Sequence, residues 1–117
     1  AVVNYYGATD MVDLLKQGKD YHQKWFRGAR PGLAKEISPL TWVKPGGPPV
    51  LTIHGDGDAQ IPYSHALRLH QALDAAKVPN QLVTIPGGAH GRHTWSDADT
   101  IRVQREIEAF LNKHVLR

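Results

Sequence analysis

Acidic and imidazole side chains gather in two short loops of the chain, where their spacing suits acid–base chemistry. The stretch LTIHGDGDAQIP ends an apolar run with His54, Asp56 and Asp58, and the stretch PGGAHGRH places His90 among glycines after another apolar run. A carboxylate that accepts the Nδ1–H of an imidazole fixes its tautomer and supports the imidazolium formed when Nε2 takes a proton. The two loops therefore predict an acid–His pair. Ordinary solvated turn residues are the alternative.

The same loops contain the atom types that bind metal ions. The candidate ligands are His54, Asp56, Asp58, His90 and His93. The run DGDAQI begins like a calcium loop, but Ile61 stands where that loop requires glycine, and Leu67 stands where it requires glutamate. The run HGRH lacks the i, i+4 spacing of a helical ligand pair. The pattern favours an acid–His pair over a metal site, and we expect no cofactor.

Three strands are expected to carry the loops. Short runs rich in β-branched and aromatic residues, each ended by glycine or proline, occur at Ala1–Tyr5, Val50–His54 and Gln81–Pro86. Strands that alternate with helices predict a parallel sheet covered on both faces. In such sheets the chemistry gathers at the carboxyl ends of the strands. The loops at those ends are Gly7–Asp10, Gly55–Pro62 and Gly87–His93.

Helix signals follow each of the three strands. Apolar residues recur at helical spacing after the second and third strands, and capping residues precede every segment. The predicted helices are Met11–Lys16 with a cap at Thr9 or Asp10, a helix capped by Ser64 that runs to about Ala76, and a final helix capped by Ser96 or Asp97.

The chain divides into three parts of a single domain. We expect residues 1–18 to form a strand and a short helix, residues 19–49 an irregular segment, and residues 50–117 a strand-helix-strand-helix unit. Prolines and glycines interrupt the middle part, which also contains Tyr21, Trp25, Phe26 and Trp42. We expect these aromatic side chains to pack into a core. A pocket for an acyl or aryl group is the alternative.

Composition excludes several classes of protein. The 117 residues carry a net charge of +3 without any basic stripe, so nucleic acid is not an expected partner. No apolar run approaches the roughly 20 residues that span a bilayer. The absence of cysteine excludes disulfides and thiolate metal sites but leaves the compartment open. Because the chain starts directly with a strand-like run at Ala1, we expect it to be a truncated piece of a longer polypeptide.

The segment PPVLTIHGDGDAQIPYSHALRLHQALDAAKVPNQLVTIPGGAHG resembles the C-terminal part of α/β-hydrolase-fold serine esterases and peptidases. The likeness is to the carboxylesterase and feruloyl-esterase-like branch and to prolyl-oligopeptidase-like catalytic domains. The stretches VVNYYGATD and ISPLTWV are similar to the segments that precede these motifs in that family. The resemblance implies the C-terminal portion of an α/β-hydrolase fold, with an incomplete sheet and no cofactor.

The resemblance also assigns roles to individual residues. In the family an apolar strand leads to His-Gly-x-x-Asp, and a last strand leads to Pro-Gly-x-x-His-Gly. Matched in order, Asp58 is the triad acid and His90 is the base. His54 is then expected to be a structural residue and Asp56 a turn residue. Residues 19–49 fall where the family carries lid elements.

The triad nucleophile has no counterpart in the chain. The family places it in a Gly-x-Ser-x-Gly turn between a strand and a helix. The serines here are Ser38, Ser64 and Ser96, and none has flanking glycines. Ser64 and Ser96 are instead expected to cap helices. The nucleophile is therefore unknown from this sequence, and the isolated chain is expected to be inactive.

These observations predict part of a serine esterase that acts on small carboxylic esters. Its expected partners are a small-molecule ester and either the missing N-terminal part of the domain or another copy of the chain. A peptidase of the same fold is one alternative. A non-catalytic module that serves only folding or interaction is the other.

Overall fold

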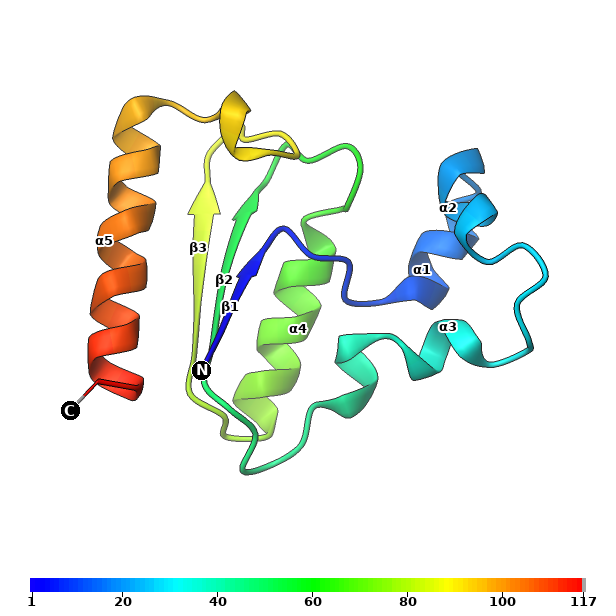
Figure 1. Cartoon of the computed structure of the whole chain (residues 1–117), viewed down its shortest axis with the longest axis horizontal. Helices are drawn as coiled ribbons and strands as arrows, with labels where there is room; N and C mark the ends of the chain where they lie inside the picture. The colour runs from blue at the N-terminus through cyan, green and yellow to red at the C-terminus, as the bar shows by residue number, and fades with distance from the viewer. Residues whose placement is uncertain (117) are drawn as a thin grey trace.

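Three parallel strands form the centre of the molecule in the computed structural model, which describes residues 1–116. The strands are β1 (Val2–Tyr5), β2 (Val50–Gly55) and β3 (Asn80–Ile85), and they lie side by side in that order (Figure 1). Both pairings are parallel. The predicted parallel sheet is confirmed, and every strand begins and ends within one residue of its expected bounds.

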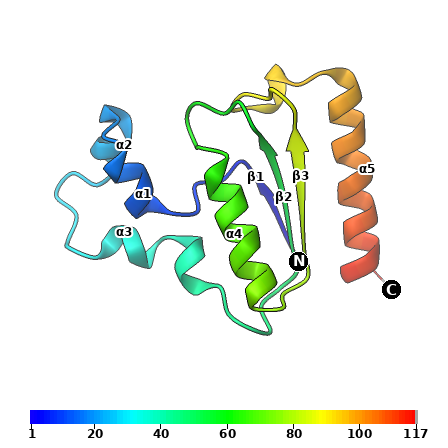
Figure 2. The ribbon, with the colours of Figure 1, turned by 180° about the vertical axis from the view of Figure 1, so that it is seen from behind.

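Helices cover both faces of the sheet. Figures 1 and 2 show α4 on one face and α5 on the other, while α1, α2 and α3 extend to one side. The helices are α1 (Met11–Lys16), α2 (Asp20–Trp25), α3 (Leu33–Glu36), the 3-10 helix η1 (Pro39–Trp42), α4 (Ser64–Ala75), the 3-10 helix η2 (Arg92–Thr94) and α5 (Asp97–His114). Among the described residues, no helix is long and apolar enough to cross a membrane.

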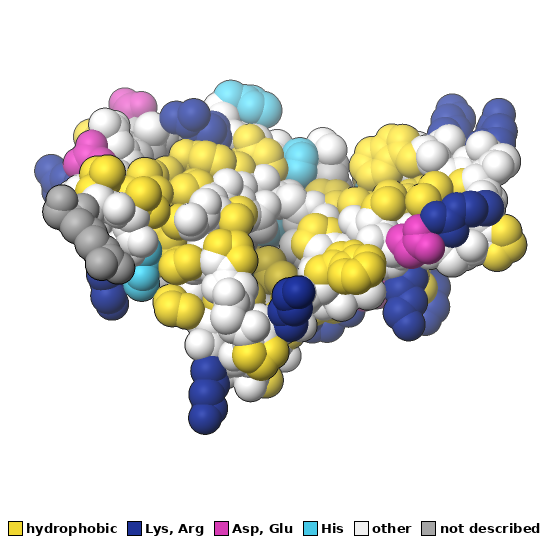
Figure 3. Space-filling view, turned by 60° about the horizontal axis from the view of Figure 1, so that its bottom comes forward, with side chains coloured by type: hydrophobic (Ala, Val, Ile, Leu, Met, Phe, Trp, Pro, Cys, Tyr) yellow, Lys and Arg dark blue, Asp and Glu magenta, His cyan; other side chains and the backbone are white. Residues whose placement is uncertain are grey.

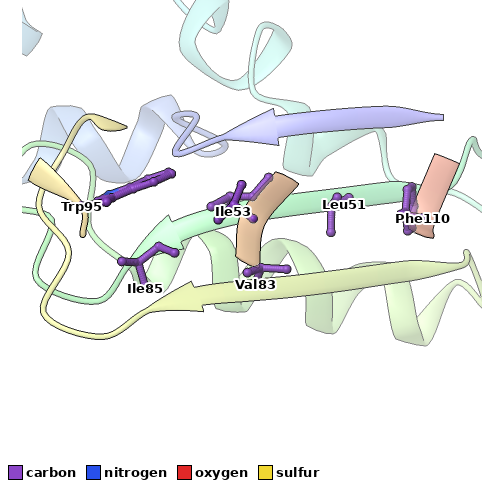
Figure 4. Packing of buried hydrophobic residues seen from close by; sticks show 7 residues of the cluster. Leu51, Ile53, Val83, Ile85, Trp95 and Phe110 are labelled. Atoms are coloured by element: carbon purple, nitrogen blue, oxygen red, sulfur yellow. The ribbon is translucent and has the colours of Figure 1, made fainter. Parts of the chain in front are cut away.

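The face beneath α5 contains the larger core. Strand side chains alternate between the two faces, and the register pairs Ile53 with both Tyr5 and Val83. The residues of this core that Figure 4 labels are Leu51, Ile53, Val83, Ile85, Trp95 and Phe110, all buried. Removal of this apolar surface from water holds α5 against the sheet.

The opposite face packs on α4. Leu69 and Leu73 from α4 join Val78 in a second buried cluster, with Val50 of β2 partly buried against it. The 3-10 helix η1 and the segment after it add Leu40 and Val43 to the same cluster. This contact attaches the end of the middle segment to the sheet.

Helix starts agree with the predicted caps in two of three cases. The side chain of Asp10 accepts the backbone N–H of Asp13 at the start of α1, and Ser96 accepts that of Asp99 at the start of α5. The prediction that Ser64 caps α4 is wrong. Tyr63 is already helical in backbone conformation, so the Ser64 hydroxyl lies within the first turn and makes no capping bond.

The prediction that the aromatic residues of the middle segment pack into a core is also wrong for three of them. Trp42 is 66% exposed and Trp25 is 59% exposed, and Tyr21 is exposed as well. For Tyr21 and Trp25 the reason is geometric, because α1, α2 and α3 form an arm that extends away from the sheet (Figure 1) and contact mainly one another. Within the described chain no second layer covers this arm. Trp42 lies instead in η1, where it lines an open groove beside β1.

The molecule is flat and extended for its length. Its principal extents are 45 × 34 × 19 Å and its radius of gyration is 15.0 Å, where a compact domain of this size has about 13 Å. Figure 3 shows hydrophobic side chains across the middle of one face and Lys and Arg side chains mostly around its outline. In residues 1–116, β1 is an edge strand that pairs only with β2.

Candidate active site

The loops after β2 and β3 are joined by backbone contacts. Gly57 N–H donates to the carbonyl of Gly88 at 3.0 Å, and Gly87 N–H donates to Oδ1 of Asp56 at 2.6 Å. A Cβ atom on Gly55 would overlap the Gly88 carbonyl, so both loops need glycine to approach this closely. Asp56 is therefore a turn residue that joins the two loops, as the sequence predicts.

This loop contact brings Asp58 and His90 together. The distance between Oδ2 of Asp58 and Nδ1 of His90 is 2.7 Å. Oδ1 of Asp58 accepts the backbone N–H groups of Gln60 and Ile61, both at 2.9 Å. The Asp58 side chain is fully buried, whereas the His90 side chain is 26% exposed. The carboxylate is thus fixed from behind, and the imidazole extends from it toward solvent.

The arrangement defines which nitrogen of His90 is free. A carboxylate only accepts hydrogen bonds, so Nδ1 carries the hydrogen that it shares with Asp58. In the neutral ring Nε2 then has a lone pair, and it bonds to no described residue. Such an imidazole can take a proton at Nε2 while Asp58 stabilises the resulting cation.

His54 supports the acid from below. Its ring is fully buried, and Nε2 lies 2.9 Å from the carbonyl of Ile61 and 3.4 Å from Oδ2 of Asp58. Burial lowers the pKa of His54, although the Ile61 hydrogen bond and the Asp58 charge act in the opposite direction. A neutral ring that donates from Nε2 satisfies both contacts. His54 is a packed, hydrogen-bonded residue, as the sequence predicts.

Tyr6 contacts the imidazole from the end of β1, and sequence reasoning missed it. Its ring centroid lies 4.6 Å from that of His90, at an interplanar angle of 60°. Its backbone has φ = +40°, which is uncommon for a residue other than glycine. The available signal was its position, directly after a predicted strand at the carboxyl edge of the sheet.

The loop after β1 is attached to α4 through His65, a second residue that sequence reasoning left without a partner. The backbone N–H groups of Thr9 and Asp10 donate to Nδ1 of His65, at 3.1 and 3.3 Å. Nε2 lies 3.0 Å from Oδ2 of Asp13. His65 is fully buried, so this contact fixes where α1 leaves the sheet.

The remaining candidates lie apart from the Asp58–His90 pair. His93 is exposed beyond His90, and Trp95 belongs to the core beneath α5. Among residues 1–116, no three His, Asp or Glu side chains are grouped so that they could hold a metal ion. The other titratable side chains of the two described loops therefore form no metal-binding group with Asp58 and His90.

Two of the three serines of the chain make structural hydrogen bonds, and the third does not. Ser38 is buried, accepts the backbone N–H of Met11 at 2.8 Å and donates to the carbonyl of Ala34. Ser96 caps α5, and Ser64 lies in the first turn of α4. None of the three hydrogen-bonds to His90 in the described part of the chain.

Comparison with known proteins gives one family and several similar structures. The BD-FAE family model matches residues 1–73. No curated protein matches the chain. A puromycin-hydrolyzing peptidase of Mycobacterium tuberculosis is 26% identical, with a TM-score of 0.84 over 97% of this chain and 18% of that one.

Two esterase structures are similar in fold. A truncated carbohydrate esterase from gut microbiota is 23% identical, with a TM-score of 0.69 over 92% of this chain and 41% of that one. Esterase 2 of Thermogutta terrifontis, phosphorylated by paraoxon, is 17% identical, with a TM-score of 0.75 over 97% of this chain and 40% of that one. The chain spans less than half the length of each of these three proteins.

Proposed function

The chain belongs to the BD-FAE family and has part of an α/β-hydrolase fold, and from this premise we propose that it supplies the acid and the base of a serine esterase. Asp58 orients His90, and His90 takes the proton of a serine hydroxyl as that oxygen attacks the ester carbonyl. His90 then gives the proton to the departing alcohol. The proposed substrates are small carboxylic esters, and no cofactor takes part.

The 2.7 Å contact between Asp58 and His90 is the observation that carries this proposal. It joins a buried carboxylate to an imidazole whose other nitrogen is accessible. Because Asp58 already accepts two backbone N–H groups, it cannot swing away from His90 without losing them. A pair of solvated turn residues would have no reason to be this well fixed.

We propose that the nucleophilic serine comes from polypeptide outside these 117 residues. The sequence has no Gly-x-Ser-x-Gly turn, Ser38 and Ser96 form hydrogen bonds within the fold, and Ser64 lies in the first turn of α4 without a hydrogen bond to His90. The greater length of the similar structures supports this arrangement. The 117-residue chain alone should then leave ester hydrolysis at the background rate.

The test uses the complete polypeptide that contains this chain. His90→Ala should lower the turnover of p-nitrophenyl acetate by several orders of magnitude, the scale found for members of a catalytic triad. Asp58→Asn should cause a large loss as well, because an amide cannot hold the required tautomer. A fluorophosphonate should label one serine of the unsubstituted protein.

A variant from the same loop is the matched control. His93→Ala removes an exposed imidazole three positions from His90. It should keep most of the turnover. Unchanged turnover in His90→Ala would reject the esterase assignment and favour a non-catalytic module.

A peptidase is the second candidate, and the likeness to the puromycin-hydrolyzing peptidase supports it. Both activities would use the same pair, since amides and esters are cleaved by the same acyl-transfer chemistry. The ratio of kcat/KM for p-nitrophenyl acetate to that for an aminoacyl p-nitroanilide separates them. A ratio below one would favour the peptidase.

A further inference from the structure

We propose that Tyr6 is a positioning residue for His90, whose ring holds the imidazole in the orientation that proton transfer requires. This inference rests on the proposed function for its catalytic consequence but not for its geometry. The contact with His90 has a centroid separation of 4.6 Å, within the usual range for aromatic pairs.

The backbone of Tyr6 directs its side chain toward His90. In an extended strand, successive side chains point to opposite faces of the sheet. Tyr5 and Tyr6 nevertheless both pack against the core beneath α5, because the positive φ of Tyr6 breaks the alternation. Two hydrogen bonds hold this turn in place: Tyr6 N–H donates to the carbonyl of Ile53 at 2.8 Å, and Gly7 N–H donates to Oδ1 of Asn4 at 3.1 Å.

The ring of Tyr6 rests on a rigid base. Its centroid lies 6.0 Å from that of Trp95, with the rings nearly perpendicular, and 6.0 Å from that of Tyr5. Trp95 is buried in the core beneath α5. Tyr6 therefore lies between the buried core and the partly exposed imidazole of His90, so the core fixes the place of the ring that contacts His90.

The contact between Tyr6 and His90 adds to the restraint that Asp58 places on the imidazole. The imidazole moves by rotation about its Cα–Cβ and Cβ–Cγ bonds, and the hydrogen bond at Nδ1 restrains this movement at one atom only. The ring of Tyr6 packs against the imidazole and so limits the directions that Nε2 can take.

A tyrosine with a positive φ is strained and persists only where the surrounding structure enforces it, and such strain is common at functional sites. Glycine at this position would adopt the same φ without strain. A purely structural role for Tyr6 would therefore predict that glycine harms packing alone. A positioning role predicts that it harms the orientation of His90.

The experiment compares four variants of the complete polypeptide. Tyr6→Phe retains the ring and should keep kcat within about threefold of the original value. Tyr6→Leu and Tyr6→Gly remove the ring and should lower kcat by about 10- to 100-fold at similar KM, as expected when a catalytic group is misplaced by a fraction of an ångström to 1 Å. Tyr21→Leu is the matched control, because it removes an exposed tyrosine ring of α2 that packs on His22 and Trp25 and contacts neither Tyr6 nor His90, and it should keep kcat.

Nuclear magnetic resonance of the imidazole C–H groups gives a readout independent of turnover. The ring current of Tyr6 should displace the His90 signals in the original protein and in Tyr6→Phe, and Tyr6→Leu should abolish that displacement. Equal His90 shifts and equal kcat in all four variants would overturn the proposal. Should His90→Ala leave ester turnover intact, the esterase assignment fails, while the ring-current comparison still decides whether Tyr6 orients the imidazole.

Discussion

At the scale of single residues, burial favours the neutral ring of two histidines, one beside the candidate site and one at the opposite end of the sheet. His54 lies beneath Asp58, and His70 in α4 makes a 2.8 Å contact from Nδ1 to Oδ1 of Asn80. Burial lowers the pKa of both rings from the ordinary value of 6.5. Hydrogen bonds and nearby carboxylates, Asp58 for His54 and Asp74 for His70, reduce this effect without reversing it.

Stability should therefore fall in mild acid. Below pH 6.5 the unfolded chain takes up protons on these two histidines, while the folded protein does not until the pH reaches their lowered pKa values. In that window the free energy of unfolding decreases as pH decreases, by at most about 1.4 kcal/mol per pH unit for each histidine. Urea unfolding of the complete polypeptide at pH 7 and pH 5 measures the slope.

His70→Gln provides the control for this slope. Glutamine retains a polar group near Asn80 but does not titrate, so the variant should lose less stability between pH 7 and pH 5 than the original protein. His93→Gln, at an exposed position, should leave the slope unchanged. A slope that is identical in His70→Gln would contradict the role given to burial.

The residues that sequence could not provide depend on features without a local pattern. The meeting of an acid and an imidazole was predictable because both loops follow strands, and parallel strands end at the same edge, while the choice of Asp58 and His90 rested on the family resemblance. Tyr6 also follows a strand, but its contact with His90 depends on the positive φ of Tyr6, which the residues NYYG do not predict. The contact of His65 with Thr9 joins positions 56 residues apart, and no local pattern encodes it.

At the scale of elements, periodicity and capping chemistry predicted most of the fold. The three strands, α1 and the cap of α5 agree with expectation because each depends on neighbouring residues in the chain. The predicted cap of α4 and the predicted burial of Trp25 and Trp42 were wrong, since these features depend on how distant elements pack.

The two serines at helix starts test this distinction. Ser96→Ala removes a side-chain oxygen that accepts the N–H of Asp99, and should lower the free energy of unfolding by about 1 kcal/mol. Ser64→Ala removes no capping bond and should change it by less than about 0.5 kcal/mol. Equal losses in thermal or urea unfolding would show that the hydroxyl of Ser64 also contributes to the start of its helix.

At the scale of the whole molecule, β1 and β3 are both edge strands among residues 1–116, and β1 borders a groove. Beside β1, a mostly apolar groove of about 410 Å³ runs between the strand, η1 and α4. Val2, Trp42 and Leu73 are among its lining residues. The groove and the edge of β1 are adjacent, so a single added element can cover both.

The 117-residue chain on its own should therefore associate with itself. Unpaired strand edges bind other strands, and the edge of β1 is not protected by charge. Light scattering after gel filtration should give a mass well above 13.0 kDa. A monodisperse monomer that unfolds cooperatively would contradict this expectation.

Val2 and Leu67 have equal exposure and provide a matched pair of positions. Val2→Lys places a charge on the open edge and should reduce the association. Leu67→Lys places the same charge on α4, where Leu67 is 41% exposed like Val2, and should leave the association unchanged.

The close approach of Gly55 and Gly88 has a consequence for how this protein can change. A methyl group at Gly55 would push the two loops apart and carry Asp58 away from His90, although neither glycine touches the imidazole. Random mutagenesis would record Gly55 as intolerant, and selection for activity would discard its variants early. A library built to alter substrate preference should hold Gly55 and Gly88 fixed and vary the exposed arm, where substitutions do not disturb the distance between acid and base.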